Sequence, residues 1–369
     1  MEAFEEVDGK HLNPNRPKPG YWHKLALLFR ASGILAITLS AWVNLQLCRW
    51  IIQPVFGRLR YRMMVDKIQQ QWFDVLFFLL KRTKLHVTGD FASLHQLHSK
   101  RRTKVLIANH ATDVDWIYLW MLAQTSQQSG HVKIILKESI RQVPIFGTMM
   151  HLLDFIWIKR NWDEDEESIT TKLDLLTSDG EQPLWLFIFP EGMTVNVKSL
   201  EKSKSFASSQ NRPQLDYTLL PRTKGVEGIL NSLRGDYDVY DLTMNFTGYS
   251  GEIPTWDMGY ERNRDFIIPN VYKLFLGMEV GECHIDIVNL GMIKANEQAL
   301  EQLLDSRWKR KDQLQHEFVQ NQCWESTSKR THLPTGNVFS VLVTISIQTS
   351  IVMSLIRLGW KQVVDKVRF

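Results

Sequence analysis

The chain has 369 residues, of which 44% are hydrophobic and 23% are charged, an ordinary composition for a folded protein. Its formal net charge of +4 is too small to indicate nucleic acid as a partner. The three cysteines, Cys48, Cys283 and Cys323, follow no zinc or redox spacing, and so sparse a set suits a reducing compartment.

The N-terminal part predicts a flexible tail followed by a membrane segment. Residues 1–20 are acidic and then proline-rich, and the acidic start argues against a secretory signal peptide. Ala31–Cys48 holds 18 residues without a charge, near the shortest length that spans a bilayer. We therefore expect a membrane segment over 21–65, with a buried core helix or a re-entrant hairpin as alternatives. Basic residues that follow the uncharged stretch, such as Arg49 and Arg58, are typical of a cytoplasmic membrane face.

The central part alternates between short apolar runs and helical stretches, which predicts an α/β fold with a mixed sheet flanked by helices over 66–325. Residues 66–80 predict either an amphipathic helix on the membrane or a core helix. The expected strands are Leu85–Gly89, Lys104–Ala108, Val132–Leu136, Phe155–Ile158, Leu184–Phe189, Tyr217–Leu220, Val239–Phe246 and Cys283–Asn289. The expected helices are Val114–Leu122, Ser139–His151, Glu164–Thr177, Val197–Ser208 and Lys224–Leu233.

Two features near the C-terminus point to a membrane. Val338–Ile356 carries no charge over 19 residues, which predicts a C-terminal membrane helix over 336–360. A second basic cluster precedes it and is expected, like the first, to face anionic lipid; it consists of Arg307, Lys309, Arg310 and Lys311.

The most informative pattern is a histidine at the end of an expected strand. The apolar run that ends at Asn109 is followed at once by His110, and Asp115 lies five positions later. A carboxylate can hold an imidazole in one tautomer, and a neutral imidazole can take a proton from an alcohol. A five-residue offset does not place the two side chains on one helical face, so they must meet across a turn. Asp113 offers a second carboxylate.

Three further polar groups follow expected strands. Lys159 and Arg160 end one run, and the arginine fork suits phosphate. A second run enters the loop Phe189, Pro190, Glu191 and Gly192, in which glycine permits close backbone approach. The third run ends at Pro221 and Arg222, where a helix begins and its amides add to anion affinity. Taken singly, each could be an ordinary strand end, and a lone histidine is usually a core residue.

Taken together and in this order, these blocks resemble the glycerophospholipid acyltransferases, which include 1-acylglycerol-3-phosphate and lysocardiolipin-type acyltransferases. The match comprises Asn109, His110 and Asp115, then Arg160, then Phe189 to Gly192, and then Pro221. It covers about residues 70–320, and 137–147 also looks like the eukaryotic branch. One departure is Met193, where the family commonly has threonine; Thr194 follows here.

The resemblance implies an acyl-CoA-dependent transfer to the hydroxyl of a lysophospholipid, with no metal and no cofactor beyond acyl-CoA as co-substrate. His110 would be the general base and Asp115 its orienting partner. The other residues would bind substrate: Asn109, Lys159, Arg160, Phe189, Pro190, Glu191, Gly192, Thr194, Pro221 and Arg222. Because a glutamate is a poor phosphate ligand, we expect Glu191 to contact a hydroxyl or to position Arg160.

Family usage favours the endoplasmic reticulum membrane, with mitochondria or lipid droplets as alternatives. Three other functions remain open at this point. They are a transacylase that uses phospholipid instead of acyl-CoA, a silent membrane protein that binds lysophospholipid, and a metal hydrolase. For the last, no third zinc ligand stands at a recognisable spacing.

Overall fold

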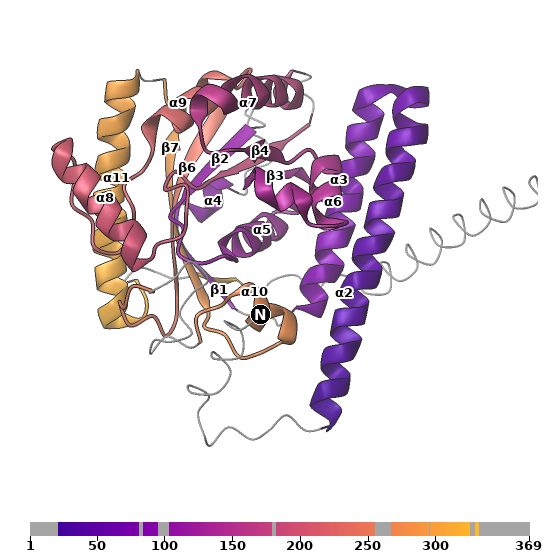
Figure 1. The fold of residues 1–369 in the computed structure, drawn as a ribbon, viewed down its shortest axis with the longest axis horizontal. Coiled ribbons are helices and arrows are strands. Elements are labelled where there is room, and N and C mark those ends of the chain that lie inside the picture. Colours follow the sequence, from indigo (N-terminus) through magenta and orange to yellow (C-terminus); the bar gives the residue numbers. More distant parts are fainter. Residues whose placement is uncertain are drawn as a thin grey trace, which may run out of the picture.

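The computed structural model describes residues 21–80, 84–94, 103–178, 182–254, 267–294, 296–324 and 329–331. The expected N-terminal tail and C-terminal membrane helix lie outside the described residues. Two parts make up the described fold, a long helical hairpin and an α/β domain beside it (Figure 1).

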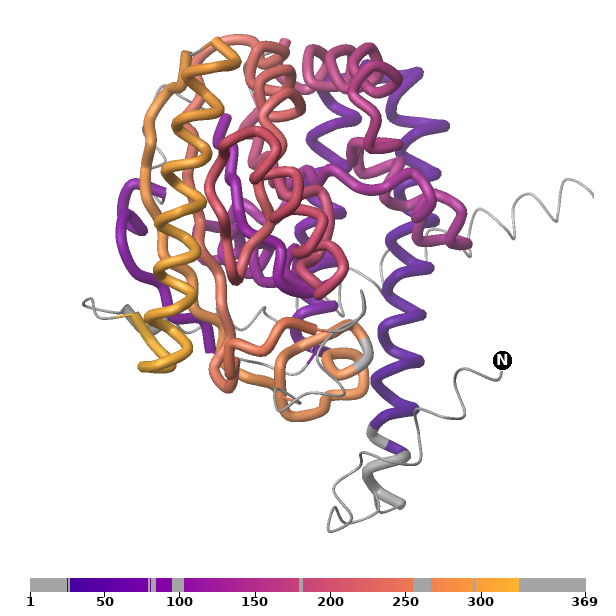
Figure 2. Tube along the Cα trace, turned by 60° about the vertical axis from the view of Figure 1, so that its left-hand side comes forward, coloured from indigo at the N-terminus to yellow at the C-terminus, as the bar shows by residue number. Residues whose placement is uncertain are grey.

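The hairpin consists of α2 (Tyr21–Leu47), a π-helical turn (Cys48–Ile52) and α3 (Gln53–Leu79). The chain reverses at Gly57, whose φ of 78° and ψ of 177° are essentially restricted to glycine. The two arms lie side by side in both views (Figures 1 and 2), and the Trp72 indole N–H donates to Thr38 Oγ1 at 3.3 Å between them. Of the alternatives for this segment, the arrangement is therefore a hairpin.

The outer surface of the hairpin is apolar. Twelve of the sixteen exposed large hydrophobic side chains in the described part of the chain lie on it, among them Phe29, Trp50 and Phe56. Leu27–Phe78 contains a stretch long and apolar enough to cross a membrane, and only 28% of that stretch is buried. So many exposed apolar side chains on one element mark a surface that contacts a membrane or a partner.

The C-terminal part of α3 belongs to the core of the α/β domain. Trp72, Phe73 and Phe77 are buried, so residues 66–80 form the core helix of the two alternatives. Polar side chains also join α3 to the strand β3 (Val132–Lys137). Asp66 Oδ1 pairs with Lys133 Nζ at 3.0 Å, and Gln69 Nε2 donates to the Val132 carbonyl at 2.8 Å. Lys133 is fully buried, which requires such a partner.

An eight-stranded mixed sheet forms the centre of the domain, in the order β4-β3-β5-β2-β6-β7-β1-β8. The first five strands of that order are parallel, β7 is antiparallel to β6, and β8 is antiparallel to β1. Besides β3, the strands are β1 (Leu85–Gly89), β2 (Thr103–Ala108), β4 (Ile156–Ile158), β5 (Leu184–Ile188), β6 (Tyr237–Phe246), β7 (Cys283–Gly291) and β8 (Lys329–Thr331). The predicted mixed α/β fold is thus confirmed.

Helices cover both faces of the sheet, because alternate residues of each central strand point to opposite sides. In β2, Leu106 and Ala108 pack in a cluster with α5 (Asp115–Thr125), α3 and α6 (Phe146–Leu152). Val105 and Ile107 pack with α7 (Trp162–Thr177), α9 (Thr223–Asn231) and α11 (Glu297–Asn321). The remaining helices are α4 (Phe91–Leu94), α8 (Val197–Ser209), α10 (Val271–Leu276) and the 3-10 turns Ser129–His131 and Glu138–Gln142.

Three expectations are wrong. Tyr217–Leu220 is not a strand, because Asp312 on α11 accepts from the backbone amides of Asp216, Tyr217 and Thr218. The helix expected over Ser139–His151 is broken at Pro144, which cannot donate a backbone hydrogen bond.

The third concerns the second basic cluster, which does not form a lipid-facing patch. Lys311 is fully buried, and both it and Arg307 pair with Asp241 on β6, each at 2.6 Å. Arg310 pairs with Glu317 at 3.2 Å. Two of the four charges therefore hold α11 against the sheet.

Candidate active site

His110 and Asp115 meet in the loop between β2 and α5, at the carboxyl edge of the parallel strands. His110 Nδ1 lies 3.0 Å from Asp115 Oδ2. The Asp115 carboxylate is fully buried, whereas the His110 side chain is 19% exposed. With Nδ1 donating to the carboxylate, Nε2 carries the lone pair of the neutral ring. The predicted pairing across a turn is therefore present, with the geometry of an oriented base.

The loop around Asp115 is built to hold that carboxylate. Asp115 Oδ2 also accepts from the amides of Ala111 at 2.7 Å and Thr112 at 3.0 Å, and Oδ1 accepts from Thr112 Oγ1 at 2.7 Å. Asp115 is the first residue of α5, where the helix dipole favours a negative charge. The carboxylate is thus fixed by four donors, one of which is the imidazole.

The segment Phe189 to Val195 wraps around His110. The Phe189 ring stacks on the imidazole, with centroids 4.4 Å apart and planes 25° apart. Glu191 Oε1 accepts from the His110 amide at 3.3 Å, and the His110 carbonyl accepts from the Val195 amide at 3.1 Å. The ring and both backbone groups of the histidine are therefore held by one loop.

Glu191 itself is 3% exposed and accepts two more hydrogen bonds, from the Leu219 amide at 3.2 Å and from Trp308 Nε1 at 3.1 Å. A carboxylate with these partners faces the protein, and the expectation that it contacts a substrate hydroxyl or Arg160 stays untested. Its contacts point to a role in holding His110.

Asn109 joins the end of β2 to β6. Its side-chain amide donates to the Met244 carbonyl at 3.1 Å and accepts from the Met244 amide at 2.7 Å. The side chain, which is 2% exposed, thus extends the ladder between the strands by one residue beyond Ala108. The structure places Asn109 next to the site, with its polar atoms engaged in the fold.

We expect Asn109→Ala to destabilise the protein by about 1–3 kcal/mol, because it leaves the buried Met244 amide without its partner, whereas the Met244 carbonyl keeps the Gln315 side-chain amide as a donor. Urea unfolding followed by circular dichroism measures this change. Asn161→Ala, which removes an exposed amide, is the matched control and should change the free energy of unfolding by less than about 0.5 kcal/mol. Equal effects of the two substitutions would contradict the assigned role.

The segment of Pro221 and Arg222 packs on the loop that runs from Phe189 to Gly192. The Arg222 amide donates to the Pro190 carbonyl at 3.0 Å, and a Cβ at Gly192 would lie 3.2 Å from Arg222 Nε. Gly192 has a φ of 76°, a conformation that L side chains rarely adopt. Pro221 is buried, and its carbonyl accepts from Arg212 at 3.2 Å. Gly192 is thus needed both for its backbone conformation and for the close approach of Arg222.

Met193 and Thr194 follow in the same loop. Met193, the departure from the family pattern, packs against a small buried cluster that consists of Val195, Leu200 and Leu219. The Thr194 carbonyl accepts from Ser199 Oγ at 3.4 Å. Met193 therefore has a packing role.

Lys159 and Arg160 lie at the end of β4, on the same sheet edge but farther along it. Their backbone amides donate to Asp165, at 2.8 and 2.9 Å, and both side chains are exposed. Arg160 has a φ of 72°, uncommon for a residue with a Cβ. Asp165, in the first turn of α7, therefore fixes the direction of this loop.

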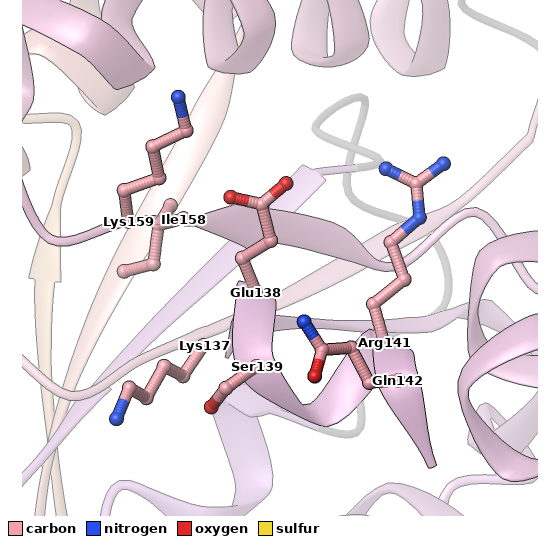
Figure 3. Close-up of a pocket in the computed structure, with 7 residues that line it drawn as sticks. All are labelled: Lys137, Glu138, Ser139, Arg141, Gln142, Ile158 and Lys159. Carbon is pink, nitrogen blue, oxygen red and sulfur yellow. The ribbon is translucent and has the colours of Figure 1, made fainter. Parts of the chain in front are cut away.

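A cavity of about 360 Å³ opens beside this loop. Figure 3 shows Lys159 and Arg141 on either side of the Glu138 carboxylate, with Lys137 below. Since β3 and β2 are separated by one strand, β5, and adjacent strands lie about 4.8 Å apart, the cavity begins about 10 Å along the edge from the histidine. Three cations and one carboxylate make it suited to an anion such as phosphate.

Asp113, the second candidate carboxylate, is turned toward α10. Its Oδ2 accepts from the Val271 amide at 3.3 Å, and burial raises its pKa to about 6. Within the described ranges, no group of three or more His, Cys, Asp and Glu residues is placed to hold a metal ion.

Several residues around the site were not among those predicted from the sequence. Trp308 belongs to a helix that was not expected, and its sequence surroundings are strongly basic. Arg141 lies in a stretch expected to be helical and Glu138 lies just before it; both fall within 137–147, which resembles the eukaryotic branch, but neither was predicted as a site residue. Thr112 could have been found, since a threonine three residues before an aspartate at a helix start often bonds to it.

Fold and site together define an α/β protein with a hydrogen-bonded histidine–aspartate pair at the carboxyl edge of its parallel strands. Residues 91–245 match the family model described as acyltransferase, and residues 274–347 match one described as acyltransferase C-terminus. The chain belongs to this acyltransferase family.

Curated relatives agree with that assignment. A probable 1-acyl-sn-glycerol-3-phosphate acyltransferase 5 of Arabidopsis thaliana is 35% identical over 67% of this chain and 60% of its own length. Lysocardiolipin acyltransferase 1 of Danio rerio is 28% identical over 76% of this chain and 66% of its own length. The match thus spans less than two thirds of the length of these relatives. Among solved structures, the 1-acyl-sn-glycerophosphate acyltransferase of Thermotoga maritima aligns with 14% identity and a TM-score of 0.44, over 78% of this chain and 98% of that one.

Proposed function

We propose that this protein transfers a fatty acyl group from acyl-CoA to the free hydroxyl of a lysophospholipid, with lysophosphatidic acid as the first acceptor to test. The observation that carries the proposal is the His110–Asp115 pair, with Nδ1 bonded to the carboxylate and the ring held by Phe189. Membership of the acyltransferase family supports the reaction class.

In the proposed reaction, His110 Nε2 takes the proton of the acceptor hydroxyl as its oxygen attacks the thioester carbonyl. The tetrahedral intermediate then collapses, the carbon–sulfur bond breaks, and the imidazolium returns the proton to the CoA thiolate. Asp115 stabilises the imidazolium and keeps Nδ1 protonated. Base catalysis of this kind contributes about 10²–10⁴-fold to the rate. A thioester is already activated, so the histidine is sufficient as base.

The basic cavity is proposed to hold the phosphate of the acceptor by Lys159 and Arg141, and Arg160 is proposed to assist from the adjacent position in the loop. The hydroxyl and the phosphate of lysophosphatidic acid are only four bonds apart, which is less than the separation of about 10 Å along the sheet edge, so the long side chains of Lys159 and Arg141 would have to reach past the end of β5 toward the histidine. The apolar hairpin would keep the site at a bilayer, where both substrates reside. We propose the endoplasmic reticulum membrane, with mitochondria or lipid droplets as alternatives.

The decisive experiment is a panel of lysophospholipids incubated with purified protein and labelled acyl-CoA. Formation of labelled diacyl phospholipid and free CoA supports the proposal. Transfer only when a phospholipid is the donor would support the transacylase alternative. No transfer from either donor to any acceptor would refute the proposed function.

For the phosphate site, we expect Arg141→Gln to raise the KM for lysophosphatidic acid about tenfold, with little change in kcat. We expect Glu138→Gln to lower that KM, because it removes a negative charge from the same cavity. Initial rates at varied acceptor concentration measure both, with Lys202→Gln on the exposed face of α8 as control. If the KM for lysophosphatidic acid changed in the same direction in Arg141→Gln and Glu138→Gln, the phosphate would not bind in this cavity.

A further inference from the structure

Glu191 is the buried charge closest to the histidine backbone, and its surroundings are unusual for a glutamate. It is 3% exposed, and it bonds to the His110 amide, the Leu219 amide and the Trp308 indole. All three are obligate donors. A protonated Glu191 would need an acceptor for its own hydrogen, so this set of partners fits the carboxylate form.

Of the three donors, only the Trp308 indole belongs to a side chain. Trp308 lies 117 positions after Glu191 in the sequence, on helix α11. It is fully buried on α11, within the part that matches the C-terminal family model. Helix α11 is itself fixed to the sheet, since Lys311 and Arg307 pair with Asp241 on β6. The indole is therefore held at Glu191 by a rigid element.

The positive charge near Glu191 favours its carboxylate form, as the Trp308 indole does. Lys311, one turn after Trp308, lies with its ammonium 5.0 Å from the Trp308 ring centroid and favours ionisation of Glu191. Burial lowers the pKa of Lys311, while Asp241 opposes that change. His110 contributes its amide from the loop after β2. Each element packed against Glu191 thus presents it with a hydrogen-bond donor or a positive charge.

We propose that Trp308 is a positioning residue, which holds Glu191 as a carboxylate so that Glu191 fixes the backbone of the catalytic histidine. Helix α11 is then part of the active site and not only a cover for the sheet. This inference rests on the proposed function only in its kinetic consequences, because the ionisation of Glu191 can be measured without turnover.

The sign of the pH dependence follows from the environment of Glu191. Burial raises the pKa of Glu191 to about 8, although the three hydrogen bonds and Lys311 lower it. The carboxylate form therefore increases as the pH rises through about 8. Loss of the indole donor removes one stabilising bond and raises the pKa further, so a higher pH is needed for the same ionisation.

The test compares Trp308→Phe with Trp324→Phe. Trp324 Nε1 donates to the Leu314 carbonyl at 2.8 Å, so the control also removes one buried indole bond to α11, but away from Glu191. Infrared titration of the carboxyl bands, assigned with Glu191→Gln, should show the Glu191 midpoint raised by about one pH unit in Trp308→Phe and unchanged in Trp324→Phe. An unchanged midpoint in Trp308→Phe would overturn the proposal.

Kinetics give a second readout. We expect Trp308→Phe to lower kcat about tenfold near neutral pH and to move the acidic limb of the pH profile upward, with the KM for acyl-CoA unchanged. In the Glu191→Gln background, the same change should have no further effect. If the two substitutions together lowered kcat by the product of their separate factors, Trp308 would act independently of Glu191. If the wild type transfers no acyl group, the proposed function fails, and the infrared titration still decides this inference.

Should Trp308→Phe fail to fold, Trp308→His is expected to fold, because a ring N–H of histidine can still donate to Glu191. A failure of Trp308→His to fold as well would instead assign Trp308 a packing role and contradict the proposal.

Discussion

We expect His110→Ala to lower kcat for acyl transfer by about 10²–10⁴-fold while the protein folds normally. The side chain is partly exposed, and its removal leaves Asp115 with the Ala111 and Thr112 amides and the Thr112 hydroxyl as donors. The loop therefore keeps its shape without the ring. Rates with labelled acyl-CoA and lysophosphatidic acid, together with thermal unfolding, measure the two effects separately.

The matched control is His316→Ala, which removes an exposed histidine from α11. It should leave the rate within about twofold of the wild type, since surface substitutions usually change little. Undiminished transfer by His110→Ala would mean that another group is the base.

The second large effect is expected at Asp115. An asparagine can turn its oxygen toward the His110 ring and the two amides, and its NH₂ toward Thr112 Oγ1. The loop therefore survives, but the charge that stabilises the imidazolium is lost. We expect Asp115→Asn to reduce kcat by about 10²–10⁴-fold, with a small change in the KM for either substrate.

Asp113→Asn is the control for this prediction, two positions away on the same loop. Burial raises the pKa of Asp113 to about 6, so a neutral amide differs less from the native state there. Its acceptor oxygen can still bind the Val271 amide. Equal losses at the two positions would show that general negative charge matters, and not the bond to the imidazole.

The central strands could be predicted because burial on both faces requires continuous apolar runs. Leu85–Gly89 was predicted with its observed bounds, and the strand around Leu106 differs by one residue. The order of the strands could not be predicted, since it depends on contacts between distant segments. The antiparallel pairing of β6 with β7 has no signal in either strand alone.

Helix α11 escaped prediction because its inner face is partly polar. Leu300, Leu304 and Trp308 are buried at helical spacing, but Lys311 and Gln315 continue the same stripe. A lysine and a glutamine there suggest a solvated surface. Only the partners on β6, which are Asp241 for Lys311 and Met244 for Gln315, explain their burial.

In the site, too, contacts between residues close in the sequence could be predicted, whereas contacts between distant segments could not. His110 and Asp115 were identified because the pair is local and its chemistry follows from the residue types. Glu191 was identified, but its partners Leu219 and Trp308 lie 28 and 117 positions away. Of the cations that line the basic cavity, only Lys159 was predicted as a site residue, because Arg141 reaches the cavity from a different strand end.

The contact between Asp66 and Lys133 has a consequence for how the protein unfolds. Lys133 is fully buried in the strand β3, and its carboxylate partner belongs to α3 of the hairpin. A chain that lacked the hairpin would lose this carboxylate together with Trp72, Phe73 and Phe77, which are buried in the core of the domain. The domain core is therefore complete only when the hairpin has packed against it, and the hairpin and the α/β domain are expected to unfold as one unit.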